Sequence, residues 1–300
     1  MKNKILQYLI IILNVLNAQG SYQILNLSSN ARSLSLNNSE SNFQSIIAAN
    51  NPASISTKND VKSYSYFLLP ANIHYIGFQN IKKNQNRINA TRISYINYGL
   101  LVDSKTNYES QAYEILIEQG SKSELYNIIS MGISGGLLLS SIADYKSSVI
   151  FLDIGFRTEW VNTLNKKIGL GLSIENLGRV IKTYTNIKED LPTLLSLGSY
   201  YELKYIPATL SINYINNYNF NNTNYFTGGI EFKLDNNFSF RLSTGSDSKD
   251  FLNRDFTSDI LSGVSAGLGF NILDINYDIG FKNLGSSGYI IGFSFIKTIR

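Results

Sequence analysis

Cysteine is absent from the 300-residue chain, and histidine and tryptophan each occur only once. Without cysteine the chain can form no disulfide, no cysteine-ligated zinc site and no thiol nucleophile. The single histidine, His74, also excludes a zinc site built from several histidines. Proline is scarce, with 4 residues, and charged residues make up 16% of the chain, below the usual quarter. These absences exclude thiol chemistry and histidine- or cysteine-based metal sites, and we expect no metal and no cofactor.

An excess of charge of one sign is also lacking. The net charge is +4, and Lys2 and Lys4 lie in a segment that we expect to be removed. No basic tract remains that would suit a phosphate backbone. We therefore predict no nucleic acid partner.

Residues 1–18 are predicted to be a secretory signal peptide. Lys2 and Lys4 precede an apolar run from Ile5 to Leu16, and Ala18 provides a small residue for cleavage. This run is shorter than the roughly 20 residues that a membrane-spanning helix needs, and later apolar runs are shorter still. An exported chain of this kind is periplasmic, secreted or an outer-membrane barrel.

Apolar residues alternate with small or polar residues along much of the chain, most clearly between residues 258 and 299. Apolar side chains occupy every second position from Val264 to Phe270, with Gly or Ser between them. The parity reverses after Asn271-Ile272, which predicts a two-residue turn there, and a third run starts at Tyr289. The large apolar face would meet a partner sheet in a soluble sandwich, or lipid in an outer-membrane barrel.

The same alternation continues through most of the chain. A chain with 20 Tyr and 16 Phe and so few charges would aggregate unless its strand edges were closed and lipid covered its apolar face. We therefore predict an all-β fold, a transmembrane up-and-down β-barrel of about 14 strands formed by residues 61–300. The predicted strands are 61–69, 73–80, 87–98, 111–119, 124–140, 145–160, 167–177, 193–203, 208–217, 224–234, 238–245, 264–270, 273–281 and 289–295.

Residues 19–60 have a different composition and are predicted to form an N-terminal plug or strap. Residues 43–49 are expected to form two helical turns that Pro52 ends, because the residue before a proline disfavours the helical region. Among the barrel connections, 103–110, 178–192 and 246–257 are long, whereas 235–237 and 271–272 are short. Long loops of such barrels face the outside of the cell, and we expect recognition to occur there.

Two G-x-S-x-G matches, at residues 132–136 and 263–267, could suggest a serine nucleophile. Both lie inside alternating strands rather than at a strand-to-helix elbow, and His74 precedes both serines. We therefore predict no catalytic residue and no enzymatic activity. His74 itself is expected to be a half-buried strand residue.

Several charged residues are expected in the lumen. Arg157, Arg179 and Arg241 could line it, although the pattern assigns them no ligand. Asp274 and Asp278 are expected on one strand face, where they could approach Glu231 and Asp153 if the strand register allowed it. Such carboxylates would form either a weak cation site or simply a hydrated face.

Short motifs follow one another in a set order from Tyr22 to the end of the chain. They contain Ala31, Arg32, Asn51, Pro52, Ala53, Tyr98, Gly99, Asn176, Gly178, Tyr184 and Pro192. In order and approximate spacing they resemble the PorQ branch of the PorV/PorQ family, FadL-like outer-membrane barrels associated with type IX secretion. One departure is Asn37-Asn38, where family members usually have a Gly pair.

The resemblance implies a non-enzymatic role in type IX protein secretion. It implies an outer-membrane barrel of a Gram-negative, Bacteroidota-like bacterium that contacts membrane lipid and anchors a surface attachment complex through a PorZ-like partner. The alternative is a FadL-like transporter of hydrophobic small molecules, which requires an apolar pocket beside the N-terminal segment. A third possibility is a plain porin with a wide, charged and open lumen.

Overall fold

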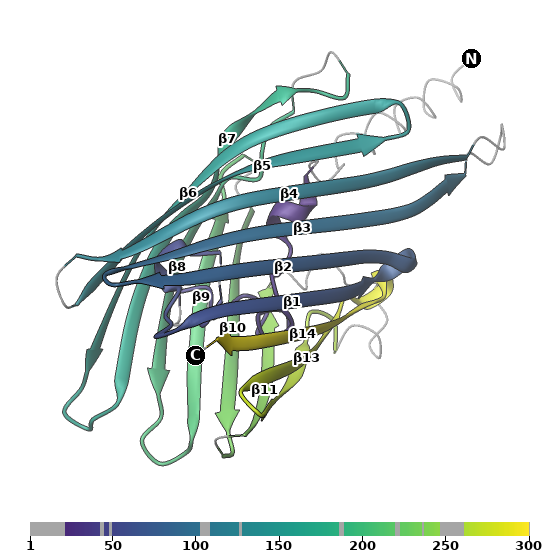
Figure 1. The fold of residues 1–300 in the computed structure, drawn as a ribbon. Coiled ribbons are helices and arrows are strands. Elements are labelled where there is room, and N and C mark those ends of the chain that lie inside the picture. Colours follow the sequence, from purple (N-terminus) through teal and green to yellow (C-terminus); the bar gives the residue numbers. More distant parts are fainter. Residues whose placement is uncertain are drawn as a thin grey trace, which may run out of the picture.

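Fourteen antiparallel strands form one closed barrel, in which each strand pairs with its sequence neighbours and β1 pairs with β14 (Figure 1). The computed structural model describes residues 22–42, 45–47, 50–102, 109–125, 128–185, 189–219, 223–235, 237–246 and 261–299, so the predicted signal peptide lies outside the described residues. The strands are β1 (Asp60–Leu69), β2 (Ile73–Asn84), β3 (Arg87–Val102), β4 (Glu109–Glu124), β5 (Ile129–Ile142), β6 (Tyr145–Val161), β7 (Lys167–Lys182), β8 (Leu194–Glu202), β9 (Ala208–Asn217), β10 (Thr223–Lys233), β11 (Phe238–Gly245), β12 (Ser265–Ile272), β13 (Ile275–Asn283) and β14 (Tyr289–Ile299). The prediction of a 14-stranded up-and-down barrel is confirmed, and closure leaves no unpaired sheet edge.

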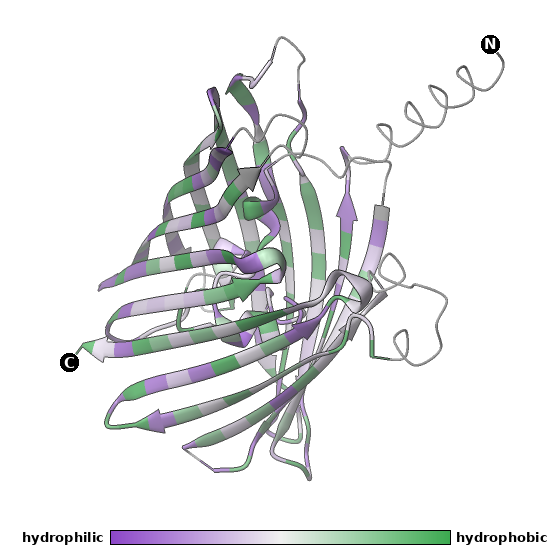
Figure 2. Ribbon diagram, turned by 90° about the vertical axis from the view of Figure 1, so that its right-hand side faces the viewer, coloured by the Kyte–Doolittle hydropathy of each residue, from purple (hydrophilic) through white to green (hydrophobic). Residues whose placement is uncertain are grey.

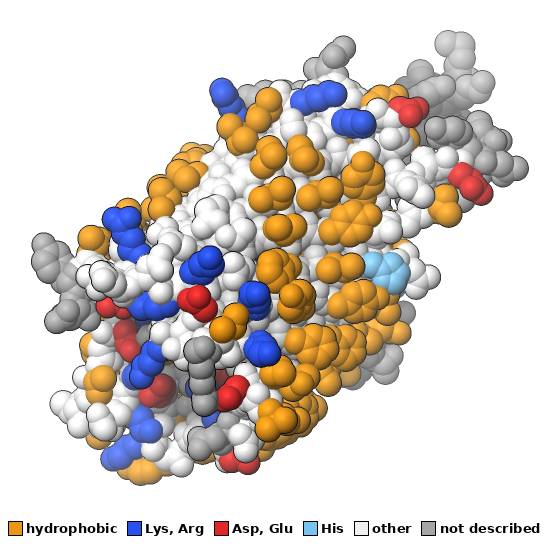
Figure 3. All heavy atoms as spheres, in the orientation of Figure 1, with side chains coloured by type: hydrophobic (Ala, Val, Ile, Leu, Met, Phe, Trp, Pro, Cys, Tyr) orange, Lys and Arg blue, Asp and Glu red, His pale blue; other side chains and the backbone are white. Residues whose placement is uncertain are grey.

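The two faces of the wall differ as the alternation predicts (Figure 2). On β1 and β2, Tyr64 and Ile76 point outward and are 56% and 53% exposed, whereas Ser65 and Tyr75 point inward and are buried. Aromatic pairs such as Tyr64 with Phe78 cross between neighbouring strands on the outer face. Figure 3 shows apolar side chains gathered on the outer face over the first strands. A closed wall with an apolar exterior is the architecture of a transmembrane β-barrel.

The two longest connections lie at one end of the barrel, although the short connections 70–72 and 143–144 are at that end too. One end, the hairpin end, carries residues 85–86, 125–128, 162–166, 203–207, 234–237 and 273–274. The other, the long-loop end, carries residues 183–193 and 246–264 together with the remaining connections. The predicted strand 124–140 was wrong at its start, because Glu124 ends β4 and a turn precedes β5.

The turn between β12 and β13 lies two residues later than predicted. Leu273 and Asp274 form it, both with positive φ (51° and 66°), and Phe270 pairs with Tyr277. A shift of two residues leaves every side chain on the same face, so alternation alone cannot choose between the two positions. Asp274 is therefore a turn residue and does not share a strand face with Asp278.

Bulges in β3 and β7 change which side chains face inward. Glu175 and Asn176 are consecutive and both buried, and the pairing of β6 with β7 shifts beside them. Beyond this bulge Val180 packs on the inner core, whereas Arg179 is exposed. The prediction that Arg179 lines the lumen was wrong because the extra residue reverses the parity of the strand.

The described residues between 22 and 57, namely 22–42, 45–47 and 50–57, are hereafter the lumen segment and lie inside the barrel (Figures 1 and 2). Their regular elements are η1 (Gln23–Asn26), α2 (Ala31–Ser35) and η2 (Pro52–Ser54). The expected helix at 43–49 is wrong in its described part, since Ser45 forms an extended bridge to Ile55. Pro52 begins η2 instead of ending a helix, because its fixed φ and missing N–H suit a first helical position. No helix in the described parts of the chain is long and apolar enough to cross a membrane.

The interior has two apolar clusters with a polar zone between them. The larger lies toward the long-loop end, where Phe67, Leu116 and Leu138 from the wall surround Ile24 and Leu25 of the lumen segment. The smaller lies toward the hairpin end, around Ile47 and Ile55 of the same segment. The lumen segment thus crosses the barrel from one end to the other and contributes to both clusters.

Candidate functional site: the lumen and its segment

Asn51 attaches the lumen segment to the barrel wall. Its side chain is fully buried (0% exposed), and its Oδ1 accepts a hydrogen bond from the Ala53 N–H at 2.9 Å. Its Nδ2 is directed at three oxygens, Asn42 Oδ1 at 2.6 Å and the backbone carbonyls of Phe156 and Leu172 at 3.3 Å. One amide therefore caps η2 and holds it against β6 and β7.

Glycines on the inner wall allow the lumen segment to approach closely. A Cβ built on Gly132 of β5 would lie 2.3 Å from the Pro52 carbonyl carbon, and one on Gly280 of β13 would lie 2.4 Å from the Ala31 carbonyl oxygen. No other residue type fits at such distances from another backbone. The lumen segment thus explains part of the inner-face glycines, whereas others, such as Gly136 and Gly269, make room for side chains of the wall itself.

The short helix α2 is attached to the opposite wall by polar groups. Asn30 caps it by accepting a hydrogen bond from the Ser33 N–H at 2.9 Å. The Ala31 N–H donates to Ser294 Oγ at 2.8 Å, and the Ser35 carbonyl accepts from Ser243 Oγ at 3.0 Å. The two contacts with the wall use small polar side chains, Ser294 and Ser243, that alternate along the inner faces of the strands.

Arg32 makes the strongest of these contacts, a two-pronged ion pair with Glu231 of β10. Its Nε and Nη2 donate to the two carboxylate oxygens at 2.9 and 2.8 Å. Arg241 of β11 donates to the same carboxylate at 2.7 Å and to Asp278 of β13 at 2.6 Å. The network contains two guanidinium and two carboxylate groups, so the buried charges are mutually compensated.

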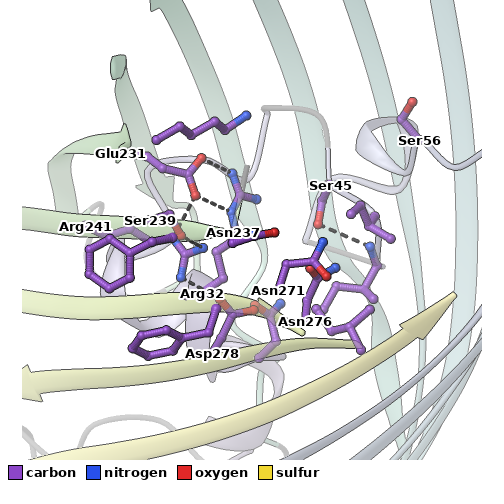
Figure 4. Close-up of a pocket in the computed structure, with 18 of the residues that line it drawn as sticks. Arg32, Ser45, Ser56, Glu231, Asn237, Ser239, Arg241, Asn271, Asn276 and Asp278 are labelled. Carbon is purple, nitrogen blue, oxygen red and sulfur yellow. Dashed lines mark hydrogen bonds and ion pairs between the residues drawn. The ribbon is translucent and has the colours of Figure 1, made fainter. Parts of the chain in front are cut away.

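A cavity of about 570 Å³ lies beside this network, toward the hairpin end (Figure 4). Its wall includes the Arg32, Glu231, Arg241 and Asp278 network, and turn residues such as Asn237 close its rim. Further polar groups line it, namely Ser45, Ser56, Lys167, Glu202, Lys233, Asn271 and Asn276. Its size suits a small solute, and its lining is mixed, because Ile46, Ile47, Phe238, Phe270 and Ile296 line it beside the polar groups.

Toward the long-loop end the lining is apolar and is filled by the chain itself. Ile24 and Leu25 of η1 are packed against Phe67, Tyr75, Ile96, Leu116, Leu138, Val149, Phe151 and Ile290 of the wall. We call this space the apolar chamber. Tyr22 closes the apolar chamber. Its ring stacks on the ring of Tyr184, with 6.1 Å between the ring centroids, and the Tyr22 hydroxyl lies 2.6 Å from Ser147 Oγ. Strands β1 to β6 thus carry large apolar side chains on their inner faces, unlike the small and polar alternate positions of the C-terminal strands.

Glu40 of the lumen segment is buried (2% exposed), and its Oε2 has no hydrogen-bond partner among the described residues. Burial raises the pKa of this carboxyl, an effect that the neighbouring Arg32 partly offsets and that Glu231 reinforces. In the unfolded chain the Glu40 carboxyl ionises at a lower pH than in the folded chain. Its contribution to the free energy of unfolding is therefore fully present below the unfolded pKa, where the carboxyl is protonated in both states. The contribution is lost as the pH rises toward the higher folded pKa.

Glu40→Gln should therefore raise the free energy of unfolding by about 1 kcal/mol at pH 8, because it removes a buried carboxylate that Arg32 compensates only in part. At pH 4 the variant and the wild type should have nearly the same free energy of unfolding. Guanidinium midpoints in detergent at the two pH values measure this. A gain of the same size at both pH values would contradict it.

The remaining motif residues lie around the lumen as well. Tyr98 donates to Glu114 at 3.1 Å, and Gly99 adopts a φ of 78° at the bulge in β3. Asn176, with a φ of 58°, donates to the Pro192 carbonyl at 3.0 Å, and the absent side chain of Gly178 leaves room for the Ile150 carbonyl. Tyr184 donates to Ser140 Oγ, and burial raises its pKa to about 12. These residues thus lie at bulges, loop attachments and segment contacts.

The candidates for chemistry are not brought together. Ser134 faces inward and donates to Asp153 at 2.7 Å, whereas His74 is on the outer face beside Tyr66. Asp278 does approach Glu231, but Arg241 lies between them. Asp153 instead lies near Glu118 and Glu175. Among the described residues no group of three or more His, Asp or Glu is arranged to hold a metal ion.

Comparison with known proteins shows a likeness in structure only. No protein-family model and no curated protein matches the chain. The toluene transporter TodX of Pseudomonas putida superposes with a TM-score of 0.56 at 10% identity, covering 90% of this chain and 96% of TodX. The fold is that of FadL-like barrels. A monoaromatic hydrocarbon channel, CymD, gives a TM-score of 0.56 at 9% identity, covering 91% and 94% of the two chains.

A FadL homologue of Pseudomonas aeruginosa completes the comparison. It superposes with a TM-score of 0.51 at 9% identity and covers 91% of this chain and 99% of its own. At such identities the likeness establishes the FadL-like fold alone. It does not distinguish the PorV/PorQ branch from other barrels of this fold.

Proposed function

We propose that this protein is a non-enzymatic barrel of the outer membrane of a Gram-negative bacterium that admits small hydrophobic molecules. The apolar chamber carries the proposal. It is a part of the lumen lined by Phe, Leu, Ile and Val side chains of the wall, and the side chains packed inside it, Ile24 and Leu25, belong to the lumen segment. A hydrophobic solute that displaced η1 would exchange one apolar contact surface for another, at little cost in buried apolar area.

The likeness to TodX and CymD supports this proposal, because those proteins are described as a toluene transporter and a monoaromatic hydrocarbon channel. Monoaromatic molecules have the size of the side chains that fill the chamber. Toluene is therefore the first ligand to test.

Ile24→Ala combined with Leu25→Ala should increase toluene binding by the purified barrel roughly tenfold, because an emptied apolar pocket stays dry and accepts an aromatic guest. Equilibrium dialysis with radiolabelled toluene measures it, in one detergent at constant concentration. The matched control is Leu170→Ala, which truncates an exposed side chain on the outer face. Equal binding by the double variant, the control and the wild type would contradict a chamber that accepts apolar ligands.

A second candidate is a PorQ-like component of type IX secretion that holds a PorZ-like partner at the cell surface in a Bacteroidota-like host. It is supported by the positions of the motif residues, since Asn51, Asn176 and Tyr184 all fix the lumen segment or its adjoining loop. Replacing residues 185–188 by a glycine-serine linker spares these residues and also keeps Glu189, which interacts with Tyr22. Pull-down of a stoichiometric soluble partner by the wild type, and its loss in this variant, would favour the second candidate over the first.

A further inference from the structure

The lumen segment is held differently by the two sides of the barrel. Against β1 to β6 it packs apolar side chains, including Ile24 and Leu25, into the apolar chamber. Against β8 to β13 most of its contacts are polar ones between short side chains, of which Ser39 with Ser211, at 2.7 Å between the hydroxyl oxygens, is typical, and the buried Leu36 beside Gly229 is an apolar exception. Asn42 with Asn213 at 3.1 Å continues the series toward β8.

These two kinds of contact respond differently to water. Hydrogen bonds between protein groups can be replaced by hydrogen bonds to water at a small net cost. Uncovering apolar side chains costs free energy in proportion to the area exposed. The lumen segment therefore separates from the β8 to β13 side more easily than from the β1 to β6 side.

The surface that such a separation would uncover is hydrophilic and has few bulky side chains. The inward residues beneath residues 31–42 are mainly glycine, serine and asparagine, namely Ser196, Gly198, Ser211, Asn213, Gly229, Ser243, Gly267 and Gly280. The cavity at the hairpin end continues from this surface, because Arg32 and Glu231 belong to both. Figure 4 shows the ion pair among the residues that line that cavity.

We propose that this cavity is the closed half of a hydrophilic passage along β8 to β13, and that the Arg32–Glu231 ion pair is the contact that keeps it closed. This passage would carry ions and small polar solutes. It is separate from the apolar chamber, so it adds a second route to the proposed function and does not depend on it.

Arg32→Ala should open the passage without leaving an isolated charge on the wall. Glu231 keeps Arg241 as its partner in this variant, and Arg241 keeps Asp278. Time-averaged conductance of the full-length barrel in planar bilayers, in potassium chloride, should rise roughly tenfold to a hundredfold, as expected for the loss of a charge-assisted contact. Glu231→Gln should act in the same direction and provides a second variant if Arg32→Ala does not fold.

The control is Arg92→Ala. It removes a buried arginine whose ion pair with Glu118 (2.5 Å) joins β3 to β4, away from the cavity. Its conductance should remain at the wild-type level. A rise equal to that of Arg32→Ala would show general loosening and overturn the proposal.

The absence of cysteine permits a reversible closure test. Ser39→Cys and Ser211→Cys replace two hydroxyls in direct contact, and their disulfide would tie the lumen segment to β9. Introduced together with Arg32→Ala, the oxidised pair should return conductance to the wild-type level, and a reductant should restore the increase. Unchanged conductance on oxidation, with the disulfide verified by mass, would overturn the proposal. So would wild-type conductance in folded Arg32→Ala and Glu231→Gln barrels.

Discussion

Gly132→Val should detach the lumen segment from the barrel wall. The new Cβ would lie 2.3 to 2.5 Å from three backbone atoms of Pro52 and Ala53, and neither β5 nor η2 can yield without losing other contacts. The cost exceeds that of ordinary overpacking, and we expect at least about 3 kcal/mol. Because the 14 strands pair independently of the segment, the barrel itself should still form.

Limited proteolysis in detergent measures this effect. Cleavage within residues 22–57 should become at least tenfold faster in Gly132→Val, while the strands remain protected. Gly228→Val is the matched control, since this glycine faces outward on β10 and its added Cβ meets nothing closer than 3.9 Å. Slow cleavage of the lumen segment in both variants would mean that the contact between β5 and Pro52 does not hold the segment against the wall.

Asn51→Asp should destabilise the protein by about 3 kcal/mol although it changes no shape. The Asp side chain keeps the acceptor for the Ala53 N–H. Its second oxygen, however, replaces a donor that faces the Asn42 side-chain oxygen and the carbonyls of Phe156 and Leu172. A buried carboxylate oxygen against three acceptors is repelled and has no compensating partner.

Guanidinium unfolding in detergent at pH 8 gives the comparison. Asn162→Asp is the control, because only the Oδ1 of Asn162 is used, as acceptor for the Leu164 and Lys166 N–H groups, and Asp retains that acceptor. We expect the control to remain within about 0.5 kcal/mol of the wild type. If the stability of Asn51→Asp also stayed within about 0.5 kcal/mol of the wild type, the Asn51 amide would not be the anchor that its geometry indicates.

The barrel wall could be predicted from the sequence because the pattern that specifies each strand lies within that strand. Alternation of period two reports which side chains face lipid, and it located every strand, with the residues of β9 and β11 predicted in full. It failed where that period is broken or ambiguous. The bulge at Asn176 reversed the facing of Arg179, and a two-residue displacement of the Leu273-Asp274 turn left the pattern unchanged.

The lumen could not be predicted in the same way, because its contacts join residues far apart in the chain. Nothing near Glu40 in the sequence indicates that it will be buried beside Arg32, or that Tyr22 will stack on Tyr184. One signal was available: glycines on the inward parity of many strands, including Gly132 and Gly280, indicate that another backbone approaches them closely. Asn51 belongs to one of the motifs, but nothing in that motif indicates that its amide contacts Asn42, Phe156 and Leu172.

The proposed passage of hydrophobic molecules is tested most directly by the rate at which toluene enters cells. Cells of a Gram-negative host that express the wild-type barrel, with correct folding verified by heat-modifiable migration, are compared with cells that carry the empty vector. We predict that radiolabelled toluene at low concentration enters several times faster when the barrel is present, and that unlabelled toluene in excess competes. Entry at the vector rate, with the folded barrel present in the outer membrane, would contradict the proposed function.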